Sequence, residues 1–255
     1  MKLSKSKLIS QLITKLNSLT QGQLFWISKI ITSFESSYSH KLLNKDFVNE
    51  TIIQNIGDSL RIHHTFSAEP FTKDKFEYAL DQAFKSDNQN SRLAPKGNPG
   101  HDIEVKSVRI SLKTQADKNI KEEKIWVSKF MELGKGEWGD NPSDLKNLMV
   151  LYLSHLNNYE KIFTLRALEK GPSTWRYELV EIPKDLLLEA SKGELEMRLE
   201  SKQYPKPGYC YIRDVDKKLK YSLYFDGGGE RKLQIKNLLK EYCVVHATWS
   251  FKVKS

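Results

Sequence analysis

The stretch from Gly100 to Lys113 constrains the fold more than any other part of the chain. Apolar and polar residues alternate along it, with a break at Lys106-Ser107. Period two is typical of β-strands, and a two-residue break between such runs is typical of a hairpin turn. The stretch therefore predicts two antiparallel strands in which Val105 faces Val108, Ile103 faces Ile110 and Asp102 faces Ser111.

One face of this hairpin is apolar, and the other is polar because residues paired across two strands share a face. The polar residues are Asp102, Glu104, Arg109, Ser111 and Lys113. An acid facing a lysine across adjacent strands suits a divalent cation and an attacking water beside a scissile phosphate. The hairpin is therefore the candidate centre of a hydrolytic site.

The charge of the chain favours a polyanionic partner. Its 255 residues carry a net charge of +9, with a pI near 9.3. Such a positive field attracts nucleic acid or an anionic membrane surface. The length and the 39% apolar fraction predict one large domain, or a core domain with a smaller subdomain.

The cysteines and the hydropathy predict a cytoplasmic protein without a membrane span. There are two cysteines, Cys210 and Cys243, and no CxxC pair, which favours a reducing compartment and disfavours a structural zinc site. No apolar stretch is long enough to cross a bilayer. The N-terminus is rich in lysine but interrupted by serine and glutamine, unlike a signal peptide.

The N-terminal region is predicted to be helical. Apolar residues recur at helical spacing over 3–17, 22–36 and 46–61. We interpret residues 1–61 as a helical subdomain that serves dimerisation or DNA contact. No clear linker interrupts residues 62–255, which we treat as one unit.

A further helix is expected over 72–84, followed by a polar loop over 85–100 that leads into the hairpin. Glu77 lies beside the apolar stripe of this helix, close enough to the core to approach an active site. Loops that enter a site carry function more often than average, so Asn98 and His101 are candidates for contact with substrate.

The rest of the chain alternates between strand and helix patterns. The expected elements are a strand or buried helix at 125–130, a helix at 142–155, strands at 161–168 and 174–182, a helix at 183–191, a hairpin at 209–225 and a strand at 243–252. The glycine-rich stretch 226–232 lets backbone approach a partner closely. Arg231, Lys232 and Lys236 are therefore candidates for contact with DNA phosphates or a guanine edge.

A helix with Glu77, then Gly100-His101-Asp102, then a strand ending Ile110-Ser111-Leu112-Lys113 resembles the PD-(D/E)XK nuclease superfamily, and more narrowly its type II restriction endonucleases. The resemblance covers residues 70–125. It implies an α/β (α+β) fold with a mixed central sheet flanked by helices. Asp102 matches the motif aspartate and Lys113 the motif lysine, with Mg²⁺ bound between the two strands.

This chain departs from the common motif at Ser111, where the family usually has an acid. Some restriction enzymes have Ser-x-Lys and supply the second carboxylate from elsewhere. The candidates for that metal ligand here are Glu77, Glu104, Glu122 and Glu123. Gln115, further along the strand, completes the catalytic candidates, and Lys106 and Arg109 complete those for DNA binding.

A second register of the motif exists. Glu104-Val105-Lys106 is itself an E-x-K triplet, with Asp87 as its upstream acid. We prefer Asp102 with Lys113, because Lys106 would lie in the hairpin turn. The alternative without a catalytic role is a surface hairpin with ordinary salt bridges.

The resemblance implies a Mg²⁺-dependent type II endonuclease that cuts double-stranded DNA as part of a restriction-modification system. Palindromic sites imply two-fold symmetry, so we expect a homodimer. Three alternatives stay open: a modification-dependent enzyme that needs 5-methylcytosine, a repair or recombination nuclease, and a non-catalytic DNA-binding protein. A nuclease of this kind needs Mg²⁺ for turnover, whereas a non-catalytic binder tolerates EDTA.

Overall fold

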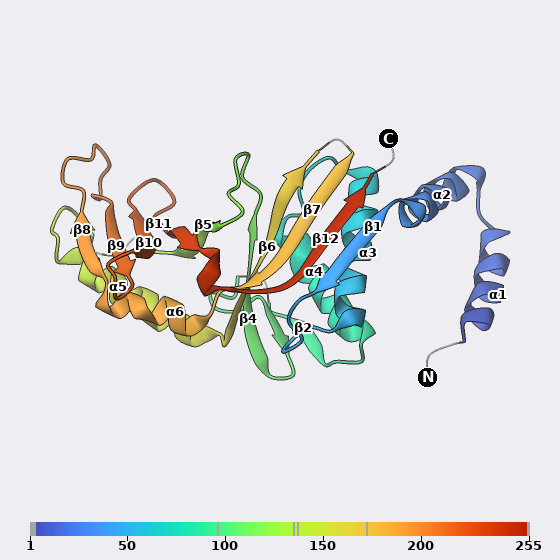
Figure 1. The fold of residues 1–255 in the computed structure, drawn as a ribbon, viewed down its shortest axis with the longest axis horizontal. Coiled ribbons are helices and arrows are strands. Elements are labelled where there is room, and N and C mark those ends of the chain that lie inside the picture. The colour runs from blue at the N-terminus through green and yellow to red at the C-terminus, as the bar shows by residue number, and fades with distance from the viewer. Residues whose placement is uncertain (1–3, 96, 135, 137, 172, 254–255) are drawn as a thin grey trace.

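Two β-sheets make up the body of the protein (Figure 1). The computed structural model describes residues 4–95, 97–134, 136, 138–171 and 173–253. The larger sheet has seven strands, in the order β1 (Tyr38–Leu42), β12 (Val244–Lys252), β7 (Thr174–Glu181), β6 (Lys161–Lys170), β4 (Val108–Gln115), β3 (Ile103–Val105) and β2 (Ser91–Leu93). The smaller sheet has five, in the order β5 (Lys124–Glu132), β11 (Lys232–Leu239), β10 (Leu219–Asp226), β9 (Gly208–Arg213) and β8 (Glu194–Met197).

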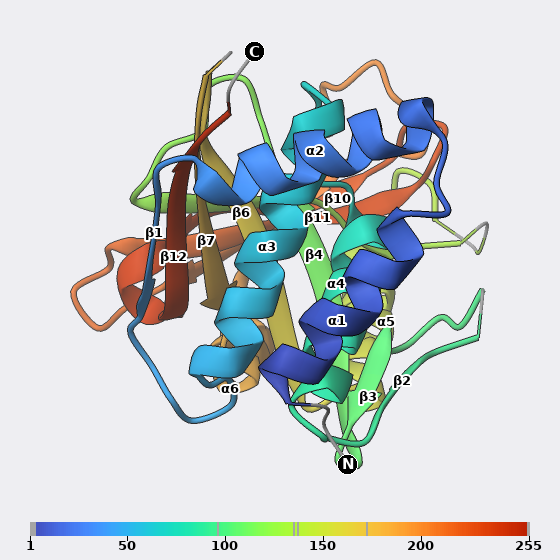
Figure 2. The same ribbon diagram turned by 90° about the vertical axis from the view of Figure 1, so that its right-hand side faces the viewer.

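The seven-stranded sheet is mixed, since β4 pairs with β6 in parallel and the other neighbours are antiparallel. Helices α3 (Glu50–Phe66) and α4 (Lys73–Ser86) lie side by side on this sheet (Figure 2). Their apolar residues form one core with the strands, which includes Ile52, Ile56, Leu60, Phe76, Leu80, Leu112 and Trp249. The mixed sheet flanked by helices agrees with the restriction-endonuclease-like fold class.

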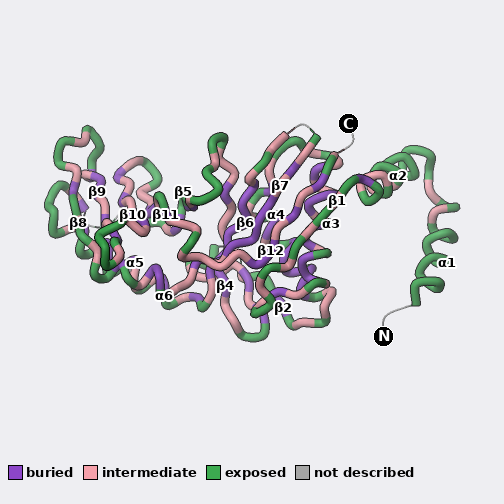
Figure 3. The backbone as a smooth tube through the Cα atoms, in the orientation of Figure 1, coloured by how far each residue is buried: buried purple, intermediate pink, exposed green. Residues whose placement is uncertain are grey.

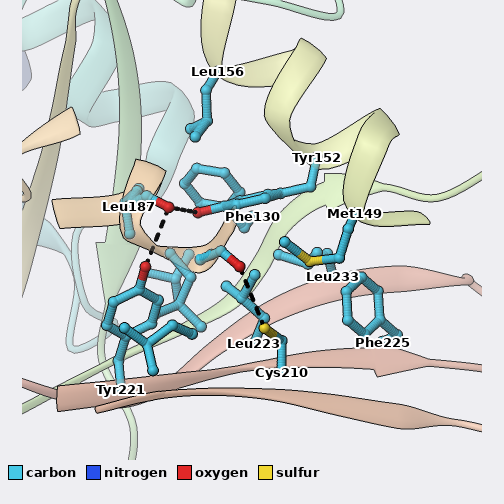
Figure 4. Close-up of a cluster of buried hydrophobic side chains, with 14 of the residues drawn as sticks. Phe130, Met149, Tyr152, Leu156, Leu187, Cys210, Tyr221, Leu223, Phe225 and Leu233 are labelled. Carbon is cyan, nitrogen blue, oxygen red and sulfur yellow. Dashed lines mark hydrogen bonds between the residues drawn. The ribbon is translucent and has the colours of Figure 1, made fainter. Parts of the chain in front are cut away.

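The five-stranded sheet packs against α5 (Asp144–His155) and α6 (Lys184–Leu188). Figure 4 shows this second core, in which the Tyr152 and Tyr221 hydroxyls both donate to the carbonyl oxygen of Leu187, at 3.1 and 3.2 Å. Ile162 and Val180 of the larger sheet belong to the same core, so the two sheets are packed together at this end. The second sheet is a finding that the resemblance alone does not imply.

The central hairpin has the register that the sequence predicts. Glu104 lies opposite Arg109, flanked by the two predicted apolar pairs. Lys106 and Ser107 both have positive φ, 49° and 68°, which is the backbone of a two-residue hairpin turn. β4 pairs with β3 as far as Ile110 and continues beside β6, where Lys113 lies opposite Thr164.

The three helices expected in the N-terminal region are present, but the third belongs to the body of the protein. Helices α1 (Lys5–Leu16) and α2 (Gln21–Glu35) extend away from the body, whereas the third expected helix is α3, which is part of the larger core (Figures 1 and 3). The boundary expected after residue 61 thus falls inside α3. α3 begins where the Asn49 side chain accepts a hydrogen bond from the Ile52 N–H at 3.0 Å, an N-cap in the usual sense.

Four strands are missing from the sequence-based prediction, namely β1, β2, β8 and β11. β1 alternates in burial but its residues are mostly polar, and it is recognisable only through its pairing with β12. β2 has three residues and lies inside the segment 85–100 that was expected to be a loop throughout. β8 has four residues and lies between the helix expected at 183–191 and the hairpin expected at 209–225. β11 follows the glycine-rich stretch and joins β10 to β5. None of the helices in the ranges described above is long and apolar enough to cross a bilayer.

Candidate active site

Asp102, Ser111 and Lys113 lie together on the polar side of the hairpin. The backbone N–H of Leu112 donates to Asp102 Oδ2 at 2.5 Å, and the Ser111 hydroxyl lies 3.4 Å from the same oxygen. Lys113 Nζ donates to Ser111 Oγ at 3.0 Å. These bonds fix the Asp102 carboxylate just before the start of β3 and link it through Ser111 to Lys113.

Helix α4 brings two more charged side chains to Asp102. Lys73 Nζ lies 2.7 Å from Asp102 Oδ1 and 3.1 Å from Glu77 Oε1. Glu77 was a sequence candidate, but Lys73 was not. The signal that could have revealed it is the i,i+4 spacing of Lys73 and Glu77, which puts both on one face of the helix.

Lys73, Asp102 and Lys113 of this cluster line a cleft of about 910 Å³ between the larger sheet, β5 and α5. The lining includes Lys73, Asn98, Asp102, Lys113, Phe130 and His155. Lys113 Nζ lies 5.5 Å from the centre of the Phe130 ring, a favourable position for a cation. A concave site with convergent charged groups is where substrate is expected to bind.

Burial controls the electrostatics of the cleft. It lowers the pKa of Lys113 to about 8, against the attraction of Asp102. Burial and the nearby Lys113 lower the pKa of His155 to about 4, so this imidazole is neutral at pH 7. Burial raises the pKa of Glu77, and the Lys73 ammonium only partly opposes this effect. Clefts with several perturbed groups of this kind are typical of functional sites.

The remaining metal and catalytic candidates have other partners. Glu104 pairs with Arg92 at 2.9 Å, and Glu122 pairs with Arg176 at 2.9 Å. Glu123 is exposed, and its carbonyl oxygen accepts from Lys240 N at 2.9 Å. Gln115 accepts from the Arg166 guanidinium at 2.8 Å. Glu77 is thus the sequence candidate that meets Asp102 through a shared cation. No group of three His, Cys, Asp or Glu side chains in the described ranges is arranged to hold a metal ion.

The candidate DNA contacts fall into two groups. On the larger sheet, Asn98 donates to the carbonyl oxygen of His101 at 2.6 Å, Arg109 pairs with Glu160 at 2.6 Å, and Lys106 is exposed at the hairpin turn. On the smaller sheet, Lys232 pairs with Glu230 at 2.9 Å, and Lys236 Nζ lies 3.7 Å from the centre of the Tyr224 ring. Arg231 directly precedes β11 and has a positive φ of 41°. The first group comes from the β3–β4 hairpin and the loop that leads into it, and the second from β11 and the residue before it.

The alternative register is not assembled in the same way. Lys106 lies at the exposed turn, whereas Asp87 ends α4 and accepts from Asn49 and Gln89, both at 2.7 Å. Asp102 and Lys113 line the same cleft, whereas neither Asp87 nor Lys106 lines it.

Comparison with known proteins identifies the family. Residues 12–251 match the SmaI family, described as type II site-specific deoxyribonuclease. The type II restriction enzyme SmaI of Serratia marcescens is 45% identical over 242 residues, which cover 94% of this chain and 96% of that enzyme. No solved structure matches the chain. The match extends over both sheets and most of the N-terminal helices, and the chain belongs to the SmaI family of type II site-specific deoxyribonucleases.

Proposed function

We propose that this restriction enzyme hydrolyses phosphodiester bonds of double-stranded DNA with Mg²⁺ held by Asp102 and Glu77. The observation that carries the proposal is the cation already held by these two carboxylates, the ammonium group of Lys73. Mg²⁺ prefers oxygen ligands, and at phosphate sites it is commonly held by one or two carboxylates, waters and the substrate. When bound, it would polarise a phosphoryl oxygen and lower the pKa of a bound water.

The protein side chains then divide the remaining work. Lys113, with its lowered pKa near 8, orients the attacking water, accepts its proton and stabilises the charge that develops on the phosphate. Ser111 holds Lys113 in place through the hydrogen bond at 3.0 Å. Leu112 N–H keeps Asp102 turned toward the cleft by binding its second oxygen.

The proposal is tested by incubating the purified protein with unmodified and cytosine-methylated plasmid, with Mg²⁺ or with EDTA. We expect discrete fragments from unmodified plasmid with Mg²⁺ and none with EDTA. The Asp102→Asn variant should give no fragments under either condition, because its side chain no longer carries the negative charge that holds the cation. Cleavage in EDTA would contradict the metal assignment. Cleavage of the methylated plasmid alone would identify a modification-dependent enzyme instead.

We further propose that the two groups of polar and basic side chains contact DNA on either side of the cleft. The first comprises Asn98, His101, Lys106 and Arg109, and the second Arg231, Lys232 and Lys236. The net charge of +9 supports contact with a polyanion. The proposed compartment is the cytoplasm, supported by the free thiols Cys210 and Cys243.

We also propose that the enzyme is a homodimer joined by an N-terminal arm, defined as α1 and α2. Neither helix has a buried residue. The arm exposes between 39% and 57% of each of nine apolar residues, namely Leu8, Ile9, Leu12, Ile13, Leu24, Phe25, Trp26, Ile31 and Phe34. Exposed large apolar side chains gathered in such number on a soluble chain are typical of an interaction site. A second copy of this chain would cover this apolar surface. Each chain contributes one cluster of Asp102 and Lys113, and cutting both strands of a duplex requires two such clusters.

The arm is attached firmly at one end. Arg61 of α3 donates to the carbonyl oxygen of Ser33 at 2.8 Å and lies 5.1 Å from the centre of the Phe34 ring. This contact fixes α2 to the body and leaves α1 available to a partner. Such an anchored arm can present the same surface in both copies, as a two-fold interface requires.

The double variant Leu8→Asp/Leu12→Asp should convert the dimer to monomer, because it buries two charges in the apolar interface at a cost of several kcal/mol. Sedimentation velocity measures the change, and plasmid nicking should replace double-strand cutting. Gln11→Asp/Thr14→Asp, which adds the same charge on the polar side of α1, should remain dimeric. A wild-type monomer, or a Leu8→Asp/Leu12→Asp dimer, would refute the arm interface.

A further inference from the structure

Both oxygens of the Asp102 carboxylate have partners. Oδ2 accepts from the Leu112 N–H at 2.5 Å, with the Ser111 hydroxyl 3.4 Å away. Oδ1 accepts from the Lys73 ammonium at 2.7 Å. The oxygen that faces away from the hairpin is therefore the one that Lys73 holds.

Lys73 also holds the second carboxylate of the proposed metal site, since its Nζ lies 3.1 Å from Glu77 Oε1. The three side chains differ in exposure: 40% for Lys73, 23% for Glu77 and 14% for Asp102. The carboxylates are thus the more fixed partners, and the lysine is the one with access to solvent. A lysine side chain has a flexible four-carbon stem and three donors that can change partners without a change in the backbone.

Lys73 lines the same cleft as Lys113 and begins α4, whose N-terminal end meets the hairpin here. Among the cationic side chains of the described residues, Lys73 is the one that contacts Asp102, because Lys113 donates to Ser111 instead. An ammonium and a divalent ion compete for the same oxygens and repel each other at such distances.

We propose that Lys73 is a resident counter-ion of the metal site, which a divalent ion must displace to reach Asp102 Oδ1 and Glu77. This inference rests on the proposed function of these two carboxylates. Displacement leaves the Lys73 ammonium in the cleft with no carboxylate partner, where a phosphate oxygen of DNA is the available anion. When the Lys73 ammonium binds a DNA phosphate, the two carboxylates are freed for the metal, and metal binding in turn frees Lys73 for the phosphate. Metal occupancy is therefore low until DNA is bound.

The test measures binding of Mn²⁺ to the full-length protein without DNA, from the electron paramagnetic resonance signal of free Mn²⁺. Lys73→Gln should bind Mn²⁺ at least about tenfold more tightly than the wild type, because a competing and repelling charge is removed. Lys73→Arg keeps the charge and should bind as weakly as the wild type. Lys75→Gln, which removes a charge two residues along the helix where Lys75 lies near His63, should change the affinity less than twofold.

Asp102→Asn separates failure of this inference from failure of the proposed site. Mn²⁺ binding that is weakened by Asp102→Asn but unchanged by Lys73→Gln would overturn the counter-ion while leaving the metal site in place. Mn²⁺ binding that is indifferent to Asp102→Asn would overturn both. Thermal unfolding with and without Mn²⁺ checks that each variant is folded, and the Mn²⁺-induced rise in melting temperature should be larger for Lys73→Gln than for the wild type.

Discussion

Replacement of Lys113 by methionine is expected to lower the rate of DNA cleavage by about 10³-fold, within the range for loss of a group that transfers a proton. Methionine keeps the apolar stem beside Phe130 but lacks the ammonium that Ser111 now positions. The rate is measured by single-turnover cleavage of a plasmid with saturating Mg²⁺. Binding to DNA, measured without cleavage in Ca²⁺, should change little, because Lys113 lies partly buried at the base of the cleft.

The matched control is Lys106→Met, which removes the lysine of the alternative E-x-K triplet. Lys106 lies exposed at the hairpin turn, where loss of one phosphate contact should weaken DNA binding only a few-fold. The two variants therefore separate the two registers. Abolition of cleavage by Lys106→Met, together with normal cleavage by Lys113→Met, would reverse the assignment of the catalytic lysine.

The hairpin could be predicted from the sequence because its determinants are local. Period-two alternation and a two-residue break define the register, which pairs Ile103 with Ile110 and so brings Asp102, the residue before β3, close to Ser111. The same holds for the helix predicted at 142–155, which is α5 and buries Leu145, Leu148, Met149 and Tyr152 at helical spacing. In both cases the signal and the structure that it specifies lie within about fifteen residues, the scale on which periodicity is informative.

The partners of the hairpin could not be predicted in this way, because they come from distant segments. Lys73 lies 29 residues before Asp102, and its side chain meets the carboxylate only after α4 has packed on the sheet. Glu122 follows β4 closely in sequence, but its carboxylate pairs with Arg176 from β7. Tertiary packing, which no local pattern encodes, decided which of the candidate carboxylates approaches the site.

The partner of Gln115 also comes from a distant segment, and it is the residue on which the stability of the larger sheet depends most. It accepts from the guanidinium of Arg166, which is fully buried in β6. The same guanidinium pairs with Glu178 and donates to the carbonyl oxygens of Lys121, Glu122 and Lys124 at 2.7 to 3.1 Å. Arg166 thus joins β4, β6 and β7 to the segment that leads into β5.

Arg166→Met is expected to lower the free energy of unfolding by about 3–5 kcal/mol, since it leaves the buried carboxylate of Glu178 without its main partner. Lys240 Nζ, 3.1 Å from Glu178, keeps the loss from being larger. Urea denaturation measures the change. Arg176→Met breaks an exposed ion pair of the same sheet, with Glu122, and should cost less than about 1 kcal/mol.

The double variant Arg166→Met/Glu178→Gln distinguishes a buried charge from lost packing. Glutamine has nearly the shape of glutamate but no charge, so the second substitution should recover part of the stability that Arg166→Met loses. An equal loss of unfolding free energy in Arg166→Met and Arg176→Met would mean that water reaches Glu178. The buried network would then not be what connects β5 to the larger sheet. Because β5 also lines the cleft, loss of this tie should lower cleavage activity before the protein unfolds, at urea concentrations below the midpoint of the unfolding transition.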